Sequence, residues 1–246
     1  MVFSGHTALI TGAGQGIGRA CAEVFATRGA DLVLMERNAV TLGEVAESLS
    51  DKGVNITTIP IDLTDLEEIR KEISRLEGKK SVDILVNNVG FDRPGTIGRI
   101  DTDDFQAVVN IHLTVPFLLI KLLLPGMSKA GWGRIVNVSS VYGVSGGKGE
   151  VAYSAVKAGV IGLTKSVSKE AGRFGVTVNA VVPGLTLTPT IEHAMADKYK
   201  EKIIQDTPLN RAGQPHEIAT VIAFLASDDA SFVSGAAIPV SGGWDG

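Results

Sequence analysis

The chain has 246 residues, 44% of them hydrophobic, and we predict one domain over residues 1–246 with one large core. Its 23 basic and 27 acidic residues give a net charge of −4, which argues against nucleic acid or an anionic membrane as a partner. The only cysteine, Cys21, fits a reducing cytoplasm. No signal peptide opens the chain, and the apolar run 115–124 is too short to cross a bilayer, so we expect a cytoplasmic protein without a membrane segment.

Short runs rich in β-branched residues alternate with helical patterns along the chain. The predicted strands are 7–10, 32–35, 56–59, 84–86, 135–138, 176–181 and 237–240. The predicted helices are 18–28, 40–50, 66–76, 103–127, 152–173 and 216–226. Apolar strands separated by helices are typical of a parallel sheet covered on both faces. We therefore predict an α/β fold with a doubly wound parallel sheet of about seven strands, and a ligand site beyond their carboxyl ends.

A glycine cluster follows the first predicted strand. Gly12, Gly16 and Gly18 fit the pattern T-G-x-x-x-G-x-G, because Ile17 stands where the G-x-G-x-x-G pattern would place its last glycine. A strand before the cluster and a helix after it can direct backbone N–H groups at a pyrophosphate. This context favours a dinucleotide site over a glycine-rich turn that binds nothing.

Two charged residues at the end of the second predicted strand bear on the choice of cofactor. Glu36 can accept hydrogen bonds from the adenosine ribose and would repel the extra phosphate of NADP, whereas Arg37 could attract that phosphate. We expect NAD in preference to NADP. The alternative is that both side chains are solvated loop charges.

Tyr153 and Lys157 are four residues apart in a predicted helix, so they share one helix face. A positive charge beside a phenol favours its ionised form, and we therefore expect Lys157 to lower the pKa of Tyr153 from its usual value of about 10. Such a phenol could act as an acid and a base. The spacing alone is weak, because it recurs by chance on many helices.

Several further motifs accompany this pair. They are Thr11-Gly12-x-x-x-Gly16-x-Gly18, Asn87-Asn88-Val89-Gly90, Asn110, Ser140, Tyr153-x-x-x-Lys157 and Pro183-Gly184. In this order they resemble the motifs of the classical short-chain dehydrogenases/reductases, most closely the 3-oxoacyl-[acyl-carrier-protein] reductases and related bacterial dehydrogenases. The resemblance covers nearly the whole chain. It has two small departures: Val89 stands where the family usually has alanine, and Ser241 stands where aspartate or asparagine is common. It implies a Rossmann fold and an NAD(P)-dependent oxidoreductase that interconverts a secondary alcohol and a ketone.

The resemblance also implies roles for four catalytic residues. Ser140 would hold the substrate oxygen beside Tyr153, which would transfer the proton. Lys157 would bind the nicotinamide ribose, and Asn110 would hold a water that connects Lys157 to solvent. Each residue also has an interpretation without catalysis. Ser140 could be a strand-end cap, Asn110 a polar helix residue, and Tyr153 and Lys157 a surface pair.

The cofactor contacts that the resemblance implies lie along much of the chain. They are Gly12, Gln15, Gly16, Ile17, Gly18, Glu36, Asp62, Leu63, Asn88, Gly90, Tyr153, Lys157, Thr186 and Thr188. Asp62 would hold the adenine edge, but it could instead cap the following helix together with Asp65. Metal-ligand spacing is absent among the histidines, so we expect no metal.

The substrate is left open between two classes. The pocket would be lined by residues 91–93, 142–150 and 185–195, with a mobile lid around 184–208. A 3-oxoacyl thioester on an acidic carrier would suit the basic Lys129, Lys169 and Arg173, although these residues could equally serve helix dipoles. The alternative is an NAD-linked dehydrogenase of a cyclic or aryl alcohol.

Two more expectations concern the chain's class and assembly. A non-catalytic protein that senses nicotinamide is the alternative to an enzyme, because a fold does not prove catalysis. The long helices 103–127 and 152–173 carry apolar residues on more than one face. The resemblance implies that these faces form a homotetramer, and extra core packing is the other explanation.

Overall fold

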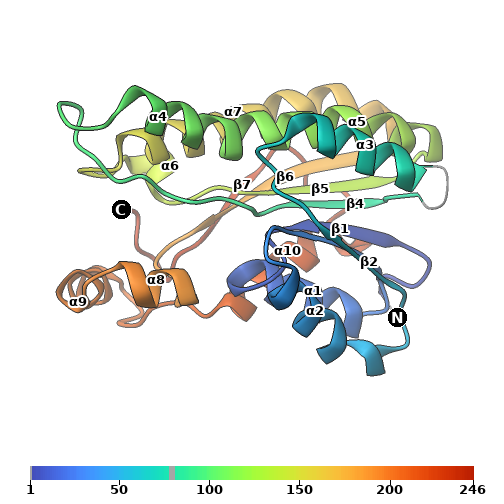
Figure 1. Cartoon of the computed structure of the whole chain (residues 1–246), viewed down its shortest axis with the longest axis horizontal. Coiled ribbons are helices and arrows are strands. Elements are labelled where there is room, and N and C mark those ends of the chain that lie inside the picture. The colour runs from blue at the N-terminus through green and yellow to red at the C-terminus, as the bar shows by residue number, and fades with distance from the viewer. Residues whose placement is uncertain (1, 78–80) are drawn as a thin grey trace.

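The computed structural model describes residues 2–77 and 81–246, and it contains one parallel sheet between two layers of helices (Figure 1). Within these residues the strands are β1 (Thr7–Thr11), β2 (Asp31–Glu36), β3 (Ile56–Pro60), β4 (Ile84–Asn87), β5 (Gly133–Val138), β6 (Val176–Pro183) and β7 (Ala237–Val240). Their order across the sheet is β3-β2-β1-β4-β5-β6-β7. The predicted parallel sheet is confirmed, and each predicted strand lies within an observed one.

The helices divide between the two faces of the sheet (Figure 1). One face is covered by α1 (Gly16–Thr27), α2 (Ala39–Ser48) and α10 (Pro215–Leu225). The other is covered by α3 (Leu66–Glu77), α5 (Val115–Ala130) and α7 (Val151–Ala171), and α4 (Thr102–Val109) leads into α5. Their apolar sides bury against strands that are themselves apolar on both faces, as a doubly wound sheet requires. Cys21 is fully buried in the first of these layers, and burial raises the pKa of its thiol.

The strand order reverses between β1 and β4, which lie side by side in parallel register. Residues that leave the carboxyl ends of these two strands diverge to opposite faces and open a crevice, the usual ligand site of such sheets. Gly12 follows β1 and Asn88 follows β4, so both lie at this crevice. The carboxyl end of β5 leads to Ser140 at the same edge.

The long predicted helix 103–127 is one helical run with a break inside it. A π-helical turn over Asn110–Thr114 separates α4 from α5. Such turns bulge out of a regular helix and are frequent at functional sites. By length and composition this run, Thr102–Ala130, could cross a membrane, but half of its most apolar window is buried, and α5 contributes its buried side chains to the core.

The segment predicted as a lid contains two helices that the sequence did not indicate. Thr188 caps α8 (Pro189–Ala194), and α9 (Asp197–Asp206) follows directly. An ion pair one turn apart, Lys200 to Asp197 at 2.8 Å, supports α9, which has no buried residue. Figure 1 shows both helices beyond the carboxyl edge of the sheet.

A chain of buried polar side chains joins the sheet to the helix that carries Tyr153. Asn87 on β4 donates to Asn137 on β5 at 2.8 Å, and Asn137 donates to Thr164 on α7 at 2.9 Å. Asn137 is fully buried. Its amide therefore fixes α7 against the two central strands.

We predict that Asn137→Ala destabilises the fold, because it leaves the Asn87 amide without its acceptor and removes the bond to Thr164. The expected loss is about 2–4 kcal/mol of unfolding free energy. Urea denaturation at one fixed protein concentration measures it. Gln205→Ala, at an exposed amide on α9, is the control and should change little. A loss for Asn137→Ala no larger than for this control would contradict the structural role.

Candidate active site

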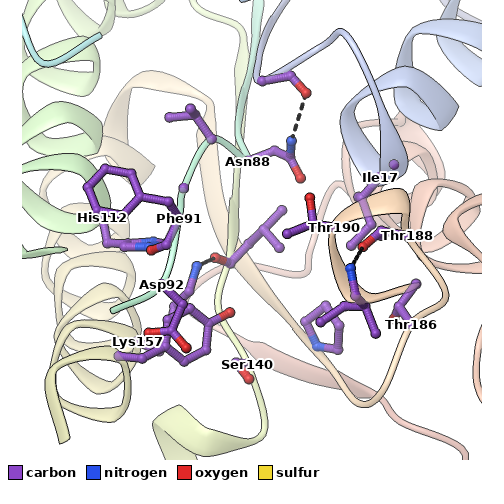
Figure 2. A pocket seen from close by; sticks show the side chains of 18 of the residues that line it. Ile17, Asn88, Phe91, Asp92, His112, Ser140, Lys157, Thr186, Thr188 and Thr190 are labelled. Atoms are coloured by element: carbon purple, nitrogen blue, oxygen red, sulfur yellow. Dashed lines mark hydrogen bonds between the residues drawn. The ribbon is translucent and has the colours of Figure 1, made fainter. Parts of the chain in front are cut away.

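A cavity of about 450 Å³ opens at the carboxyl edge of the sheet, a volume typical of small-molecule sites. It runs from the glycine loop and Glu36 at one end to Ser140 and Tyr153 at the other. Figure 2 shows Asp92, Ser140 and Lys157 on one side of it, opposite the lid threonines. All the predicted cofactor residues except Gly18 line the cavity, as do the predicted catalytic residues except Asn110.

The glycine loop is held in place by close backbone approaches. A Cβ at Gly18 would collide with the carbonyl of Gly12, so only glycine allows α1 to begin so near the end of β1. Asn88 donates its side-chain amide to the carbonyls of Thr11, at 3.0 Å, and Gly12, at 3.3 Å. Asn88, predicted as a cofactor contact, therefore also positions the loop that would hold the pyrophosphate.

The backbone N–H groups of the two residues that follow Glu36 direct its side chain toward the glycine loop. Its carboxylate accepts from the N–H groups of Arg37, at 2.8 Å, and Asn38, at 3.1 Å. A Cβ at Gly14 would lie 2.8 Å from Glu36 Cγ, so this glycine allows the carboxylate to approach. Gly14 was not among the predicted site residues, although it lies within the glycine cluster.

The hydrogen bonds of Asp62 distinguish between its two interpretations, as an adenine contact and as the cap of α3. Asp65 caps α3 by accepting from the N–H groups of Glu67, at 3.1 Å, and Glu68, at 2.9 Å. Asp62 instead accepts from the N–H and hydroxyl of Thr64, which hold the pKa of its carboxyl below the usual value with help from the positive charge of Arg37. Asp62 and Leu63 line the end of the cavity where an adenine would lie.

The lid meets the glycine loop across the cavity. Gln15 donates to the hydroxyl of Thr190 at 3.3 Å, and a Cβ at Gly16 would lie 3.0 Å from Thr188 Cγ2. Thr186 is buried and donates to the carbonyl of Gly184 at 3.1 Å. The segment predicted as a lid thus lies against the glycine loop. His193, by contrast, is exposed to solvent on α8.

Ser140, Tyr153 and Lys157 converge at the other end of the cavity. Lys157 Nζ lies 5.3 Å from the centre of the Tyr153 ring, as the spacing along α7 predicts. The same ammonium is buried and donates to the carbonyl of Val138 at 2.8 Å. The Ser140 hydroxyl interacts with the Tyr153 phenol and favours its ionised form.

The expected direction of the Tyr153 pKa is wrong for this structure. Burial of the phenol raises its pKa, the negative charge of Asp92 adds to the rise, and Ser140 offsets only part of it. Burial also lowers the pKa of Lys157 to about 7, so the ammonium is itself only marginally charged at neutral pH. The effect of desolvation on the Tyr153 pKa therefore outweighs the effect of the neighbouring Lys157 charge. Tyr153 is protonated here, as a proton donor to a ketone must be.

The structure does not bring Asn110 to the other three residues. Its side chain is exposed and accepts from Gln106 at 3.0 Å, so its role remains a prediction. Ile111 and His112 are the buried residues of the same π-helical turn, and the His112 ring meets the Tyr153 ring edge-on at 5.4 Å. Sequence reasoning dismissed His112 because it lacked metal-ligand spacing, although its position two residues after Asn110 was a usable signal.

His112 has one tautomer in this setting. Its Nε2 lies 2.7 Å from the carbonyl of Phe91, which can only accept, so Nε2 carries the proton. Burial and the charge of Lys157 lower the pKa of His112 to about 3, and the ring is neutral. A Cβ at Gly90 would collide with this ring. His112 thereby fixes the segment that leads from β4 into the substrate end of the cavity (Figure 2).

The basic residues considered for an acidic carrier lie elsewhere in the chain. Lys129 is near the end of α5, just before β5 begins. Lys169 is near the end of α7, and Arg173 lies in the short 3₁₀ turn between α7 and β6. Both positions are at the amino edge of the sheet, opposite the cavity. Within one chain these residues cannot flank the pocket opening.

The fold and the site define a nicotinamide-dependent oxidoreductase that acts on CH–OH groups, and comparisons with known proteins agree. A family model described as enoyl-(acyl carrier protein) reductase matches residues 12–245. The 3-oxoacyl-[acyl-carrier-protein] reductase of Vibrio harveyi is 37% identical over 244 residues, which cover 99% of this chain and 98% of that protein. The chain belongs to the short-chain dehydrogenase/reductase family.

Solved structures show the same similarity. A 3-oxoacyl-[acyl-carrier protein] reductase from Brucella melitensis superposes with a TM-score of 0.94 at 32% identity, covering 100% of this chain and 93% of that one. Levodione reductase superposes with a TM-score of 0.93 at 34% identity, covering 98% of both chains. The non-catalytic alternative is therefore not supported.

Proposed function

We propose that this enzyme interconverts a secondary alcohol and a ketone by hydride exchange with NAD, and that Tyr153 is the acid and base. The observation that supports this most is the convergence of Ser140, Tyr153 and Lys157 at one end of a cavity whose other end is a glycine loop. When bound, the nicotinamide supplies or accepts the hydride. We further propose that the enzyme is cytoplasmic and acts as a homotetramer.

The chain's own residues account for the proton transfer. Ser140 donates a hydrogen bond to the substrate oxygen and places it beside the Tyr153 hydroxyl. Tyr153 gives its proton to that oxygen as the ketone is reduced, and takes it back as the alcohol is oxidised. Lys157, held by the Val138 carbonyl, lies close enough to stabilise the phenolate that reduction leaves behind. Asn110 remains the proposed link from Lys157 to solvent.

The proposed preference for NAD depends on the charges at the adenosine end. The Glu36 carboxylate lies over Gly14, where a phosphate on the adenosine ribose would meet a like charge. Arg37 could attract that phosphate, but its charge already acts on Asp62. At this end of the cavity the negative charges of Glu36 and Asp62 therefore outweigh the positive charge of Arg37.

We predict that Glu36→Ser shifts the cofactor preference toward NADP. Removing the carboxylate removes a like-charge contact of about 1–4 kcal/mol, so kcat/KM for NADPH relative to NADH should rise by at least about fivefold. Initial rates with one ketone and both cofactors measure the ratio. Glu47→Ser, at an exposed carboxylate on α2, is the control. A wild-type preference for NADPH would show that the cofactor assignment is wrong.

Two substrate classes remain for this reaction. The first is a 3-oxoacyl or 3-hydroxyacyl thioester, which the names of the relatives suggest. The second is a cyclic or aryl alcohol oxidised with NAD, which the position of Glu36 and the similarity to levodione reductase favour. Rates of NADH and NADPH oxidation with acetoacetyl thioesters and with simple cyclic and aryl ketones separate the two. Lack of turnover with every ketone in this panel would count against the proposed function.

A further inference from the structure

The segment that follows β7 brings an aromatic residue, Trp244, to the cavity. β7 runs parallel to β6 and ends at the same edge of the sheet, where the N–H of Gly184 donates to the carbonyl of Val240 at 3.2 Å. A tight turn follows, in which the N–H of Trp244 donates to the carbonyl of Ser241 at 3.2 Å. Trp244 lines the cavity as a result, although it lies outside the segments predicted to form the pocket.

Two glycines fix this turn against the end of the predicted lid. Gly242 and Gly243 have φ angles of 64° and 89°, in the left-handed region that favours glycine. A Cβ at Gly242 would lie 2.9 Å from Thr207 Cγ2, and the carbonyl of Gly242 accepts from the N–H of Leu209 at 3.1 Å. Trp244 is therefore positioned by a packed turn, not by a loose loop.

Trp244 meets a second aromatic residue at the substrate end of the cavity. Its ring contacts that of Tyr142 edge-on, with centroids 5.8 Å apart, a favourable geometry for two aromatic rings. Tyr142 begins α6 (Tyr142–Ser145), and its N–H donates to the Ser140 hydroxyl at 3.3 Å. Figure 1 shows the segment after β7 between α6 and the lid helices. The aromatic pair therefore lies beside the place where Ser140 would hold the substrate oxygen.

The charged and apolar groups at this end limit what the aromatic pair can bind. Four apolar side chains of the predicted lid also line the cavity: Leu185, Ile191, Met195 and Ile203. Asp92 and Glu150 supply carboxyl groups. Among the described residues that line the cavity, the positively charged side chains are Arg37, at the adenosine end, and Lys157, which the proposed chemistry uses. An anionic group on the substrate would thus find no free cation beside the aromatic pair.

We propose that Trp244 and Tyr142 bind an uncharged ring attached to the reacting carbon, so that the preferred substrates are aryl and cyclic ketones and the corresponding alcohols. The inference rests on the proposed function and selects the second of its two substrate classes. A rigid ring makes a large contact with aromatic side chains and has little conformational freedom to lose. A 3-oxoacyl thioester would place a thin, flexible chain against them, which gains less contact and loses more freedom. Trp244 is the residue that determines this specificity.

The test compares NADH oxidation with acetophenone, with cyclohexyl methyl ketone and with the acetoacetyl thioester of N-acetylcysteamine, which is uncharged. We expect kcat/KM of the wild type to be at least about tenfold higher for both ring ketones than for the thioester. Trp244→Ala should lower this ratio at least about tenfold, chiefly through KM for the ring ketones. The change in the ratio is independent of the ketones' intrinsic reactivity.

Two further variants accompany Trp244→Ala. Trp244→Phe keeps an aromatic ring at this position and should retain most of the preference for the ring ketones. Phe232→Ala, at a fully exposed aromatic residue outside the cavity lining, is the matched control and should keep the wild-type ratio.

Two results would overturn the inference: a wild type that uses the thioester as well as the ring ketones, or an unchanged ratio in Trp244→Ala. Binding provides a readout that does not depend on turnover. The dissociation constant of acetophenone for the NADH complex of Tyr153→Phe, from isothermal titration, should rise about tenfold in Tyr153→Phe/Trp244→Ala. This rise, without turnover of any ketone by the wild type, would support the aromatic site and contradict the oxidoreductase. Turnover that does not respond to Trp244→Ala would contradict the aromatic site alone.

Discussion

Tyr153→Phe is expected to lose about 10²- to 10⁴-fold of the turnover rate while it still binds NADH, because the substitution removes one hydroxyl and with it the proton donor. The ring remains, so its edge-on contact with His112 and the packing of α7 should be kept. Steady-state rates with a ketone substrate measure the loss. NADH fluorescence measures the dissociation constant, which should change little.

Tyr199→Phe is the control for this experiment. Its phenol is 57% exposed on α9, outside the cavity lining, so the same loss of a hydroxyl should leave turnover close to the wild type. Near-normal turnover in Tyr153→Phe with an authenticated substrate would show that another group transfers the proton. Loss of NADH binding together with turnover would instead indicate that the phenol acts mainly on the cofactor site.

The second large effect is expected from Gly18→Ala. Its new methyl group would collide with the Gly12 carbonyl and lie 2.7 Å from the Asn88 amide, so the loop or α1 must shift. Overpacking of this kind costs about 1–3 kcal/mol, and the dissociation constant for NADH should rise by about 10- to 100-fold. Isothermal titration measures the change, and circular dichroism verifies that the fold persists.

Gly43→Ala provides the matched control. Gly43 lies inside α2, and a Cβ there would meet nothing within 4 Å. The alanine should therefore stabilise the helix by about 0.5–1 kcal/mol and leave NADH binding unchanged. If the two variants bound NADH equally well, close packing of the glycine loop would not be needed for cofactor binding.

The sheet was predictable because its strands carry their own signal. Strands such as β1 and β6 are buried along their whole length, and they appear in the sequence as short runs rich in β-branched residues. The lid helices carry no such signal, since α9 has a mostly polar surface and depends on contacts such as the ion pair of Lys200 and Asp197. The π-helical turn was also missed, because its five residues, Asn110–Thr114, carry no signal that distinguishes them from the α-helical pattern on either side.

The site was predictable where residues lie close in the chain and less so where they meet through the fold. The i,i+4 spacing gave the proximity of Tyr153 and Lys157, but it could not give the burial that reverses the expected pKa shift. Asp92 and Glu150 were predicted to line the pocket, and they do. The parallel bridge between Gly95 and Glu150 joins their two segments, and local sequence does not indicate it.

The central claim is hydride transfer to a ketone carbon with the proton supplied by Tyr153. The most direct test incubates the enzyme with a ketone that it reduces and with NADH carrying deuterium at both C4 positions. Mass spectrometry and NMR of the alcohol should then show one deuterium on the carbinol carbon, and Tyr153→Phe should form this product about 10²- to 10⁴-fold more slowly. An alcohol product without deuterium at that carbon would contradict the account.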